Sequence, residues 1–262
     1  MTHLRKRIKI SWLWLPYVLF LPFLPIAKVI LYIFMILSLH EMAHILCAII
    51  FHYPVEKVIV YPFGLSATIA YIGYGNLIKE TIIICAGPFM HVLLPYLFHI
   101  LYSVGWISAP FLAYLNMMNA SILIFNLLPI YPLDGGRLLQ VFFGSLLRFQ
   151  TANKATIFCS IGVILWLYSS HLLAGFSGTL VLLFLFLQNI ETYRKLPMIR
   201  QSFHHYRMHH PVSYDIIMNE KQDLYRGRYN MLHRKQGWMR EQDWLRMHFP
   251  EDVEKPKEKR QS

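Results

Sequence analysis

Two histidines and a glutamate near the beginning of the chain have the types and spacing of a metal-dependent hydrolytic site. His40 and His44 are four residues apart, so in a helix both imidazoles project from one face and can bind a single metal ion. The Glu41 carboxylate stands beside them and can reach a water molecule activated by the metal without being a ligand itself. This H-E-x-x-H pattern predicts a zinc (Zn2+) site with Glu41 as the general base.

Asp134 is the predicted third ligand, because hydrolytic zinc usually takes three protein ligands and keeps one position for water. It is the only acid between Glu80 and Glu191. Pro129, Pro132 and the Gly135-Gly136 pair are expected to interrupt a helix at the end of the fourth span, so that the carboxylate can turn inward. An ordinary loop with an Asp-Gly turn is the alternative interpretation.

The composition indicates that a polytopic membrane protein must position these residues. The chain is 56% hydrophobic and 15% charged, whereas soluble domains are about a quarter charged. Only four of its 14 acids lie in residues 1–190. This shift in composition divides the chain into a membrane domain, residues 1–195, and a basic cytoplasmic tail, residues 196–262.

Six segments satisfy the rule that a membrane span needs about 20 mostly apolar residues. They predict an all-α polytopic fold with about six transmembrane helices, at residues 11–27, 29–51, 80–102, 111–130, 154–170 and 174–192. His40 and His44 then lie inside the second span. An ionisable residue at that depth costs about 2.5 to 3.5 kcal/mol, so it marks either function or a paired structural role between packed helices.

Basic residues gather at the ends of the apolar segments, although the net charge is +11. This placement favours membrane orientation and contact with the anionic lipid bilayer over nucleic-acid binding. If six spans alternate, one side receives residues 5–9, Lys57, Lys79, Arg137, Arg148 and Lys154. The positive-inside rule then predicts that both termini are cytoplasmic.

Residues 55–70 are rich in β-branched and aromatic side chains around Pro62 and Gly64, which predicts a short membrane-associated β-hairpin. Strands cannot lie open in hydrocarbon, so the hairpin should sit at the interface or against protein. Its edge could accept an extended substrate strand, which matters because a helical substrate shields its peptide bonds.

The two motifs together resemble the site-2 protease family (peptidase family M50) over about residues 5–195. The resemblance lies in His40-Glu41-x-x-His44 and in Asn126-Leu-Leu-Pro-Ile-Tyr-Pro132-Leu-Asp134-Gly-Gly, and it is strongest to sporulation members from endospore-forming bacteria. It implies that His40, His44 and Asp134 bind zinc and that Glu41 is catalytic. Asn126 and Pro132 are expected to shape the site or hold substrate.

Gly87-Pro88 in the third span resembles a further feature of the family. A packing glycine explains it equally well, so no catalytic role is assigned to this pair.

The resemblance also implies a biological setting. The substrate would be the membrane-associated pro-form of a late sporulation sigma factor (pro-sigma-K), cleaved by regulated intramembrane proteolysis. Inhibitory membrane partner proteins would hold the protease inactive. The location would be a multi-pass bacterial cell membrane, namely the mother-cell membrane that surrounds the forespore.

The tail departs from the sporulation members, which often end in a nucleotide-sensing cystathionine-beta-synthase-type (CBS) domain. Residues 196–262 are too few for more than a reduced CBS-like region. Within them, residues 229–239 predict a hairpin and residues 240–248 a short helix. The histidines at 204, 205, 209 and 210 are expected to be solvated, with metal binding by the paired histidines as the alternative.

An intramembrane metal-ion transporter is the alternative function, because buried His, Glu and Asp residues could also form a transit site. A transporter should carry such residues along several spans, whereas the intramembrane acids here are essentially Glu41 and Asp134, beside scattered His91 and His99. An inactive scaffold is disfavoured because the complete set of zinc-site residues is present.

Overall fold

The computed structural model describes residues 8–12, 27–61, 64–172, 175–212, 215–220, 223–234 and 237–249. Within them the protein is mostly helical, with two small β-sheets. The helices are α2 (Ala27–Ile50), α3 (Leu77–Ser103), α4 (Ala109–Asn126), α5 (Asp134–Leu146), α6 (Phe149–Ser169), α7 (Phe176–His209) and α8 (Glu241–His248).

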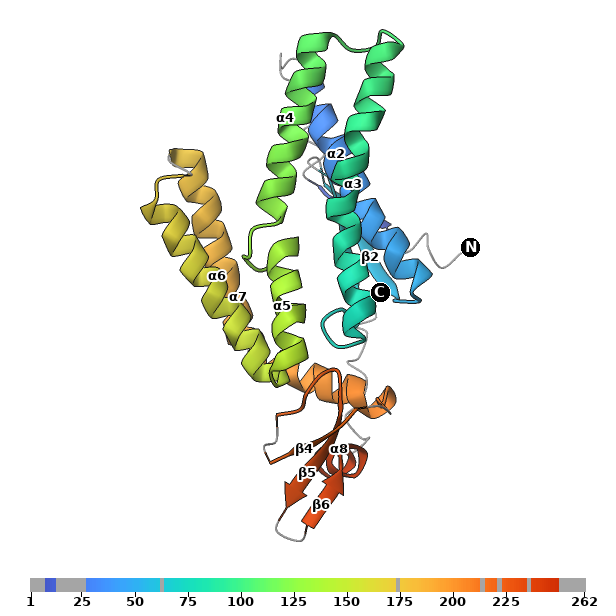
Figure 1. The fold of residues 1–262 in the computed structure, drawn as a ribbon, viewed down its shortest axis with the longest axis vertical. Helices are drawn as coiled ribbons and strands as arrows, with labels where there is room; N and C mark the ends of the chain where they lie inside the picture. The colour runs from blue at the N-terminus through green and yellow to red at the C-terminus, as the bar shows by residue number, and fades with distance from the viewer. Residues whose placement is uncertain are drawn as a thin grey trace.

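The long helices form two groups with separate apolar cores. Ile36, Phe98 and Leu115 belong to the core shared by α2, α3 and α4, whereas Ile164 and Leu185 belong to the core between α6 and α7. Helix α5 stands between the two groups and packs against both α3 and α6 (Figure 1). A site built from α2 and α5 therefore joins the two halves of the molecule.

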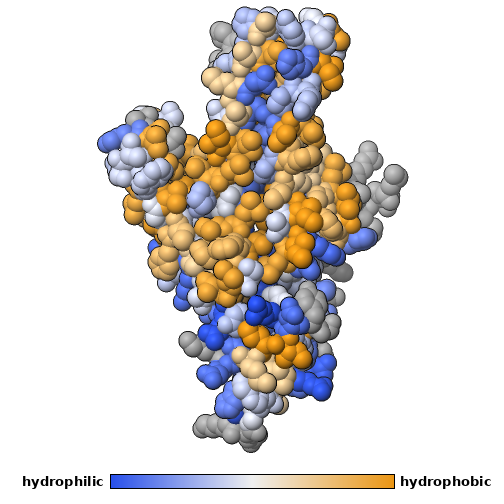
Figure 2. All heavy atoms as spheres, viewed as in Figure 1, coloured by the Kyte–Doolittle hydropathy of each residue, from blue (hydrophilic) through white to orange (hydrophobic). Residues whose placement is uncertain are grey.

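Four described helices, α2, α3, α6 and α7, are long and apolar enough to cross a membrane by length and composition. Hydrophobic residues dominate a band across the middle of the visible face, whereas hydrophilic residues are common at the upper end and in the C-terminal part below (Figure 2). The structure therefore supports a polytopic membrane protein. The sidedness of the termini stays a prediction.

The spans predicted at 29–51, 80–102 and 154–170 correspond to α2, α3 and α6, with ends that differ by at most five residues. The span predicted at 174–192 corresponds only to the first part of α7, which continues to His209. The predicted span at 111–130 corresponds to α4, which ends at Asn126 and is not among these four helices. The predicted first span at 11–27 lies almost entirely outside the described residues. Six spans are therefore not confirmed.

The first sheet has the order β1-β2-β3, with β1 at Ile8–Ile10, β2 at Val55–Tyr61 and β3 at Gly64–Ile69. Antiparallel pairing of β2 with β3 confirms the hairpin predicted at 55–70. The parallel pairing of β1 with β2 was not predicted. Since β2 is central, β3 forms an edge of this sheet.

The C-terminal unit combines β4 (Ile216–Asn219), β5 (Tyr229–Arg234), β6 (Gly237–Arg240) and α8. Strand β4 runs parallel and β6 antiparallel to β5. The predicted hairpin and short helix are thus confirmed. The proposed division at 195/196 falls inside α7, which continues without a break to His209.

His204 corrects the expectation that the tail histidines are solvated. Its side chain is buried, and its ring lies edge-on to Trp244 and Phe249, with centroids 5.5 and 5.1 Å away. His205, His209 and His210 are exposed as expected. Helix α7 buries one face against the C-terminal unit, and that face includes position 204.

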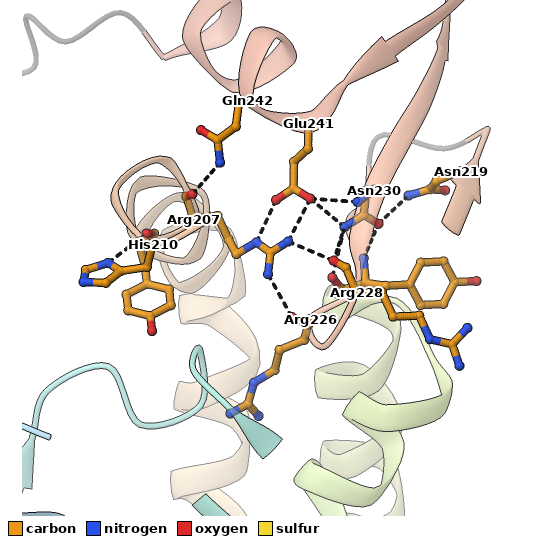
Figure 3. A network of polar contacts seen from close by, with 10 residues as sticks. Arg207, His210, Asn219, Arg226, Arg228, Asn230, Glu241 and Gln242 are labelled. Atoms are coloured by element: carbon orange, nitrogen blue, oxygen red, sulfur yellow. Dashed lines mark hydrogen bonds and ion pairs between the residues drawn. The ribbon is translucent and has the colours of Figure 1, made fainter. Parts of the chain in front are cut away.

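A buried polar network holds the C-terminal unit on α7 (Figure 3). The Arg207 guanidinium donates to both carboxylate oxygens of Glu241, at 2.7 and 2.8 Å, and to the backbone oxygens of Arg226 and Arg228. The second Glu241 oxygen also accepts from the backbone and side chain of Asn230. Both charges are therefore paired and hydrogen-bonded, which is the condition for burying them without a large penalty.

The same unit contacts the ends of the membrane helices. Arg226 forms a buried ion pair with Glu80 in the first turn of α3. Phe149 at the start of α6 stacks on Phe203 with centroids 3.9 Å apart, and its backbone N–H donates to the Leu224 oxygen at 2.8 Å. The tail is thus packed against the membrane domain.

Candidate metal centre

Helix α2 presents both histidines on its buried face. Ile36, His40, His44 and Ala48 follow one another at intervals of four residues, and all are buried. The Nε2 atoms of His40 and His44 lie 3.1 Å apart. The predicted spacing therefore brings the two imidazoles to one point.

The backbone of α3 fixes the orientation of His44. The Nδ1 atom lies 2.8 Å from the Ile83 carbonyl oxygen, to which it donates as N–H. The proton on Nδ1 leaves the lone pair on Nε2, as a metal-ligating imidazole requires.

Asp134 is the first residue of α5 and reaches the same point from the other half of the molecule. Its Oδ2 atom lies 3.1 Å from His40 Nε2 and 3.4 Å from His44 Nε2. The helix break predicted at 129–136 is confirmed on its N-terminal side, where α4 ends at Asn126. Beyond it, however, Gly135 and Gly136 continue directly into a helix that was not predicted.

Residues 127–133 form the loop that delivers Asp134, and two other helices hold it. The Tyr131 N–H donates to Ser160 Oγ of α6 at 2.9 Å, and Asn189 Nδ2 of α7 donates to the Tyr131 oxygen at 2.6 Å. A Cβ at Gly135 would lie 2.1 Å from the Leu127 oxygen. The loop thus folds closely back on the first turn of α5.

Glu41 lies between the histidines and the β-hairpin. Its Oε1 accepts the Ala67 N–H of β3 at 2.9 Å, and Glu41 groups with His40 and His44 so that their ligand atoms lie within 4.8 Å of one another. The backbone of β3 therefore orients one carboxylate oxygen.

A cavity of about 260 Å3 opens on this cluster. It is lined by Leu37, His40, Glu41, Leu65, Asn126, Pro132, Leu133, Asp134 and Arg137. Five of the six predicted site residues thus line one cavity, and the sixth, His44, lies behind it in contact with His40 and Asp134. The individual roles assigned to them remain proposals.

The donor set fits a zinc ion. Asp134 Oδ2 is buried and accepts no hydrogen bond of normal geometry within the described part of the chain, despite its closeness to two imidazole nitrogens. Acceptor atoms this close repel one another unless a cation neutralises them. Two imidazole nitrogens and one carboxylate oxygen are a typical ligand set of hydrolytic zinc, and His40, His44 and Asp134 would hold it.

The sequence analysis assigned no role to two features of α3 that contact this cluster. A Cβ on Gly87 would lie 2.2 Å from His44 Nε2 and 2.6 Å from His40 Cε1. His91, one turn later, is buried, lies 5.0 Å from the His40 ring between centroids, and has its Nδ1 2.7 Å from Asn119 Oδ1. Gly87 and His91 are four residues apart, and this spacing could have indicated that both lie on the face of α3 that packs against the histidines of α2.

Comparisons with known proteins agree with the motifs. The sequence model of Peptidase family M50 matches residues 101–169. Over 134 residues the chain is 34% identical to Stage IV sporulation protein FB of Bacillus subtilis (strain 168), an alignment that covers 51% of this chain and 46% of that protein. The chain therefore spans about half the length of this curated relative.

The fold is similar to that of the Site-2 Protease from Methanocaldococcus jannaschii. The TM-score is 0.53 at 22% identity, and the match covers 70% of this chain and 89% of that one. These findings confirm the resemblance to the site-2 protease (peptidase M50) family.

Proposed function

We propose that this chain is an intramembrane zinc metalloprotease of the site-2 type that performs regulated intramembrane proteolysis. One observation carries the proposal: His40 and His44 of α2 converge with Asp134 of α5 at distances of 3.1 to 3.4 Å, beside Glu41 and inside a membrane-helix bundle. The segment matched by the M50 sequence model includes Asp134.

The roles follow from the positions of the side chains. Zinc, when bound, would lower the pKa of a water molecule and polarise a peptide carbonyl. Glu41 would take the proton from that water, because His40, His44 and Asp134 already provide three donors and the Glu41 carboxylate adjoins them. The Ala67 N–H holds one Glu41 oxygen, leaving the other to receive the proton.

Strand β3 is the proposed docking edge for an extended substrate. It pairs with β2 on one side, and its Ala67 N–H points to the site on the other. A substrate strand added along β3 would bring a peptide bond past Glu41, with Asn126 and Pro132 shaping the opposite wall of the cavity.

The proposed substrate is the membrane-associated pro-form of a late sporulation sigma factor, pro-sigma-K, with inhibitory membrane proteins as regulatory partners. The proposed place is the mother-cell membrane around the forespore, with both termini in the cytoplasm. The 34% sequence identity to Stage IV sporulation protein FB, over 51% of this chain, supports these assignments.

The alternative, a metal-ion transporter, has no comparable support. The described residues contain one metal-ligating group of His, Cys, Asp or Glu, the one at His40, Glu41 and His44. The further buried acid Glu80 is already paired with Arg226. A chain of transit sites along several spans is therefore absent from the described part of the molecule.

The test is cleavage during co-expression with candidate pro-sigma factors, followed by metal analysis of the purified protein. Wild type and the exposed control Glu56→Gln should give a shortened product, whereas Glu41→Gln and Asp134→Ala should give none. Glu41→Gln should retain zinc and Asp134→Ala should lose it.

Each outcome bears on a different part of the proposal. Cleavage by Glu41→Gln would reject the general-base role. Cleavage of other membrane-bound proteins but of no pro-sigma factor would reject the substrate alone. A purified wild type without zinc or activity would reject the function.

A further inference from the structure

Arg137 lies one helical turn after Asp134 on α5 and lines the metal-site cavity together with Glu41 and Asn126. The three-residue separation puts Asp134 and Arg137 on one face of the helix. The side chain of Arg137 is half-buried. A cation therefore adjoins the proposed catalytic groups without being one of the six predicted site residues.

A second cavity, of about 190 Å3, borders the first at Arg137, which is the residue common to both linings. Its polar lining includes Glu80, Tyr131, Gln140 and Asn153. It lies on the side of the C-terminal unit, whose Arg226 pairs with Glu80. The acid of this second cavity is thus already matched to another arginine.

The Arg137 guanidinium forms neither an ion pair nor a side-chain hydrogen bond with any residue in the described ranges, although its backbone N–H donates to Leu133. The two nearby carboxylates are otherwise engaged, Glu41 with the Ala67 N–H and Asp134 with the imidazoles. The guanidinium is therefore held by no other side chain in the described ranges and is free to bind a group that arrives with the substrate.

The place where charge develops indicates what that group is. When Glu41 takes a proton from the attacking water, its negative charge passes to the attacking oxygen and then to the substrate, so the total charge of the site stays the same while its location changes. Attack of water on a peptide carbonyl moves the C=O π electrons onto oxygen and creates a negative charge. Arg137 lines the same cavity and offers that oxygen a cation whose N–H donors are arranged in a planar fork.

Building on the proposed function, we propose that Arg137 is a further catalytic residue that donates hydrogen bonds to the carbonyl oxygen of the scissile peptide as that oxygen becomes negatively charged. The water oxygen forms the new bond to carbon and its proton passes to Glu41. When the C–N bond breaks, the electron pair on oxygen reforms the carbonyl and the leaving nitrogen takes the proton. Arg137 itself stays protonated throughout.

The experiment compares Arg137→Gln and Arg137→Lys with wild type and with Lys154→Gln, which removes an exposed charge on α6. Arg137→Gln should lower kcat on the order of 100-fold with KM little changed, as for loss of an oxyanion donor. Arg137→Lys keeps the charge without the fork and should lose less, about 10-fold. Lys154→Gln should match wild type, and every variant should bind zinc in full.

A binding measurement separates transition-state from ground-state contacts. A phosphinic peptide, built on the sequence that the wild type cleaves, should bind Arg137→Gln about 100-fold more weakly than wild type. The uncleaved substrate peptide should bind equally to Glu41→Gln and to Glu41→Gln combined with Arg137→Gln. Equal binding of the phosphinic peptide to wild type and Arg137→Gln would overturn the proposal.

Two further outcomes would also overturn the role of Arg137: a higher KM at unchanged kcat, or a loss seen only in vesicles of anionic lipid and not in neutral detergent, which would make Arg137 a lipid contact. Both leave the protease function standing. A zinc-loaded wild type that cleaves nothing would instead reject the proposed function, and this inference with it.

Discussion

At the scale of single residues, the candidate metal centre depends on Gly87, a position of α3 that has no room for a side chain. Gly87 lets the backbone of α3 approach both imidazoles, and a Cβ there would lie 2.2 Å from His44 Nε2. His44 cannot easily move aside, because its Nδ1 is bound to the Ile83 oxygen and its side chain is buried. The absence of a side chain at Gly87 therefore allows His40 and His44 to keep their positions.

Gly87→Ala should displace His44 and lower zinc affinity by at least about 10-fold, the magnitude typical of disturbing groups that orient a metal ligand. Zinc competition with a chelator measures the affinity, and cleavage should fall with it. Gly162→Ala on α6 is the control, because a Cβ there meets nothing within 4 Å. Full zinc affinity in Gly87→Ala would contradict this prediction, because it would mean that α2 and α3 can move apart without disturbing the histidines.

The sequence identified the candidate ligands better than their surroundings. His40, His44 and Asp134 could be named because spacing and the scarcity of acids are visible in one dimension. The Gly87 contact and the nearness of His91 to His40 arise from the packing of α3 on α2, and no local pattern specifies that packing. Conformational freedom at a glycine is visible in sequence, whereas the atoms around it are not.

At the scale of elements, the loop 127–133 determines where Asp134 stands. Asn189 of α7 is fully buried and donates to the Tyr131 oxygen, so a helix far along the chain supports the loop that carries the proposed third ligand. The same amide donates to Leu185 within its own helix. Helices α6 and α7 thus act as a support for the site without contributing a ligand.

Asn189→Leu should leave the Tyr131 oxygen buried without this donor, at a cost of about 1 to 3 kcal/mol, and should shift Asp134 relative to the histidines. We expect weaker zinc binding and slower cleavage together, measured by chelator competition and product formation. Thr179→Val serves as control, because it removes a side-chain hydrogen bond on an exposed part of the same helix. Equal losses in both variants would argue against a specific role of Asn189.

Elements with a strong local signal were predictable, and those that depend on partners were not. The hairpin at 55–70 followed from β-branched residues around a Pro-Phe-Gly segment. Strand β1 is three residues long and is defined only by its pairing with β2. Helix α5 begins with Asp-Gly-Gly, which reads locally as a turn, yet its glycines are required for close packing on the preceding loop.

At the scale of the molecule, the C-terminal unit is bound to the membrane domain through a buried charge pair. Glu80 accepts the N–H groups of Gly73 and Gly75 and pairs with Arg226, and both charged side chains are almost fully buried. The segment that Glu80 organises connects β3 to α3. Glu80 therefore contacts both the segment that follows the β2-β3 hairpin and the C-terminal unit.

Glu80→Gln should leave the buried Arg226 charge unpaired and weaken docking of the tail by about 3 to 5 kcal/mol. Hydrogen exchange at residues 216–249 should rise, and limited proteolysis there should become faster. Combining it with Arg226→Met should recover much of the protection. The control Glu191→Gln breaks an exposed ion pair with Lys195 and should change neither hydrogen exchange nor proteolysis. Equal hydrogen exchange in Glu80→Gln and wild type would contradict the role of Glu80 in docking the tail.

The continuity of α7 has a consequence for exchanging parts between related proteins. One helix carries the chain from the membrane core to Arg207, so its length sets both the distance and the rotation of the C-terminal unit. Adding one residue would turn that unit by about 100° and move it about 1.5 Å, whereas adding four would nearly restore the angle but move it about 6 Å. No insertion restores both, so a chimera can keep the contact between Arg226 and Glu80 only if it inherits α7 at its present length.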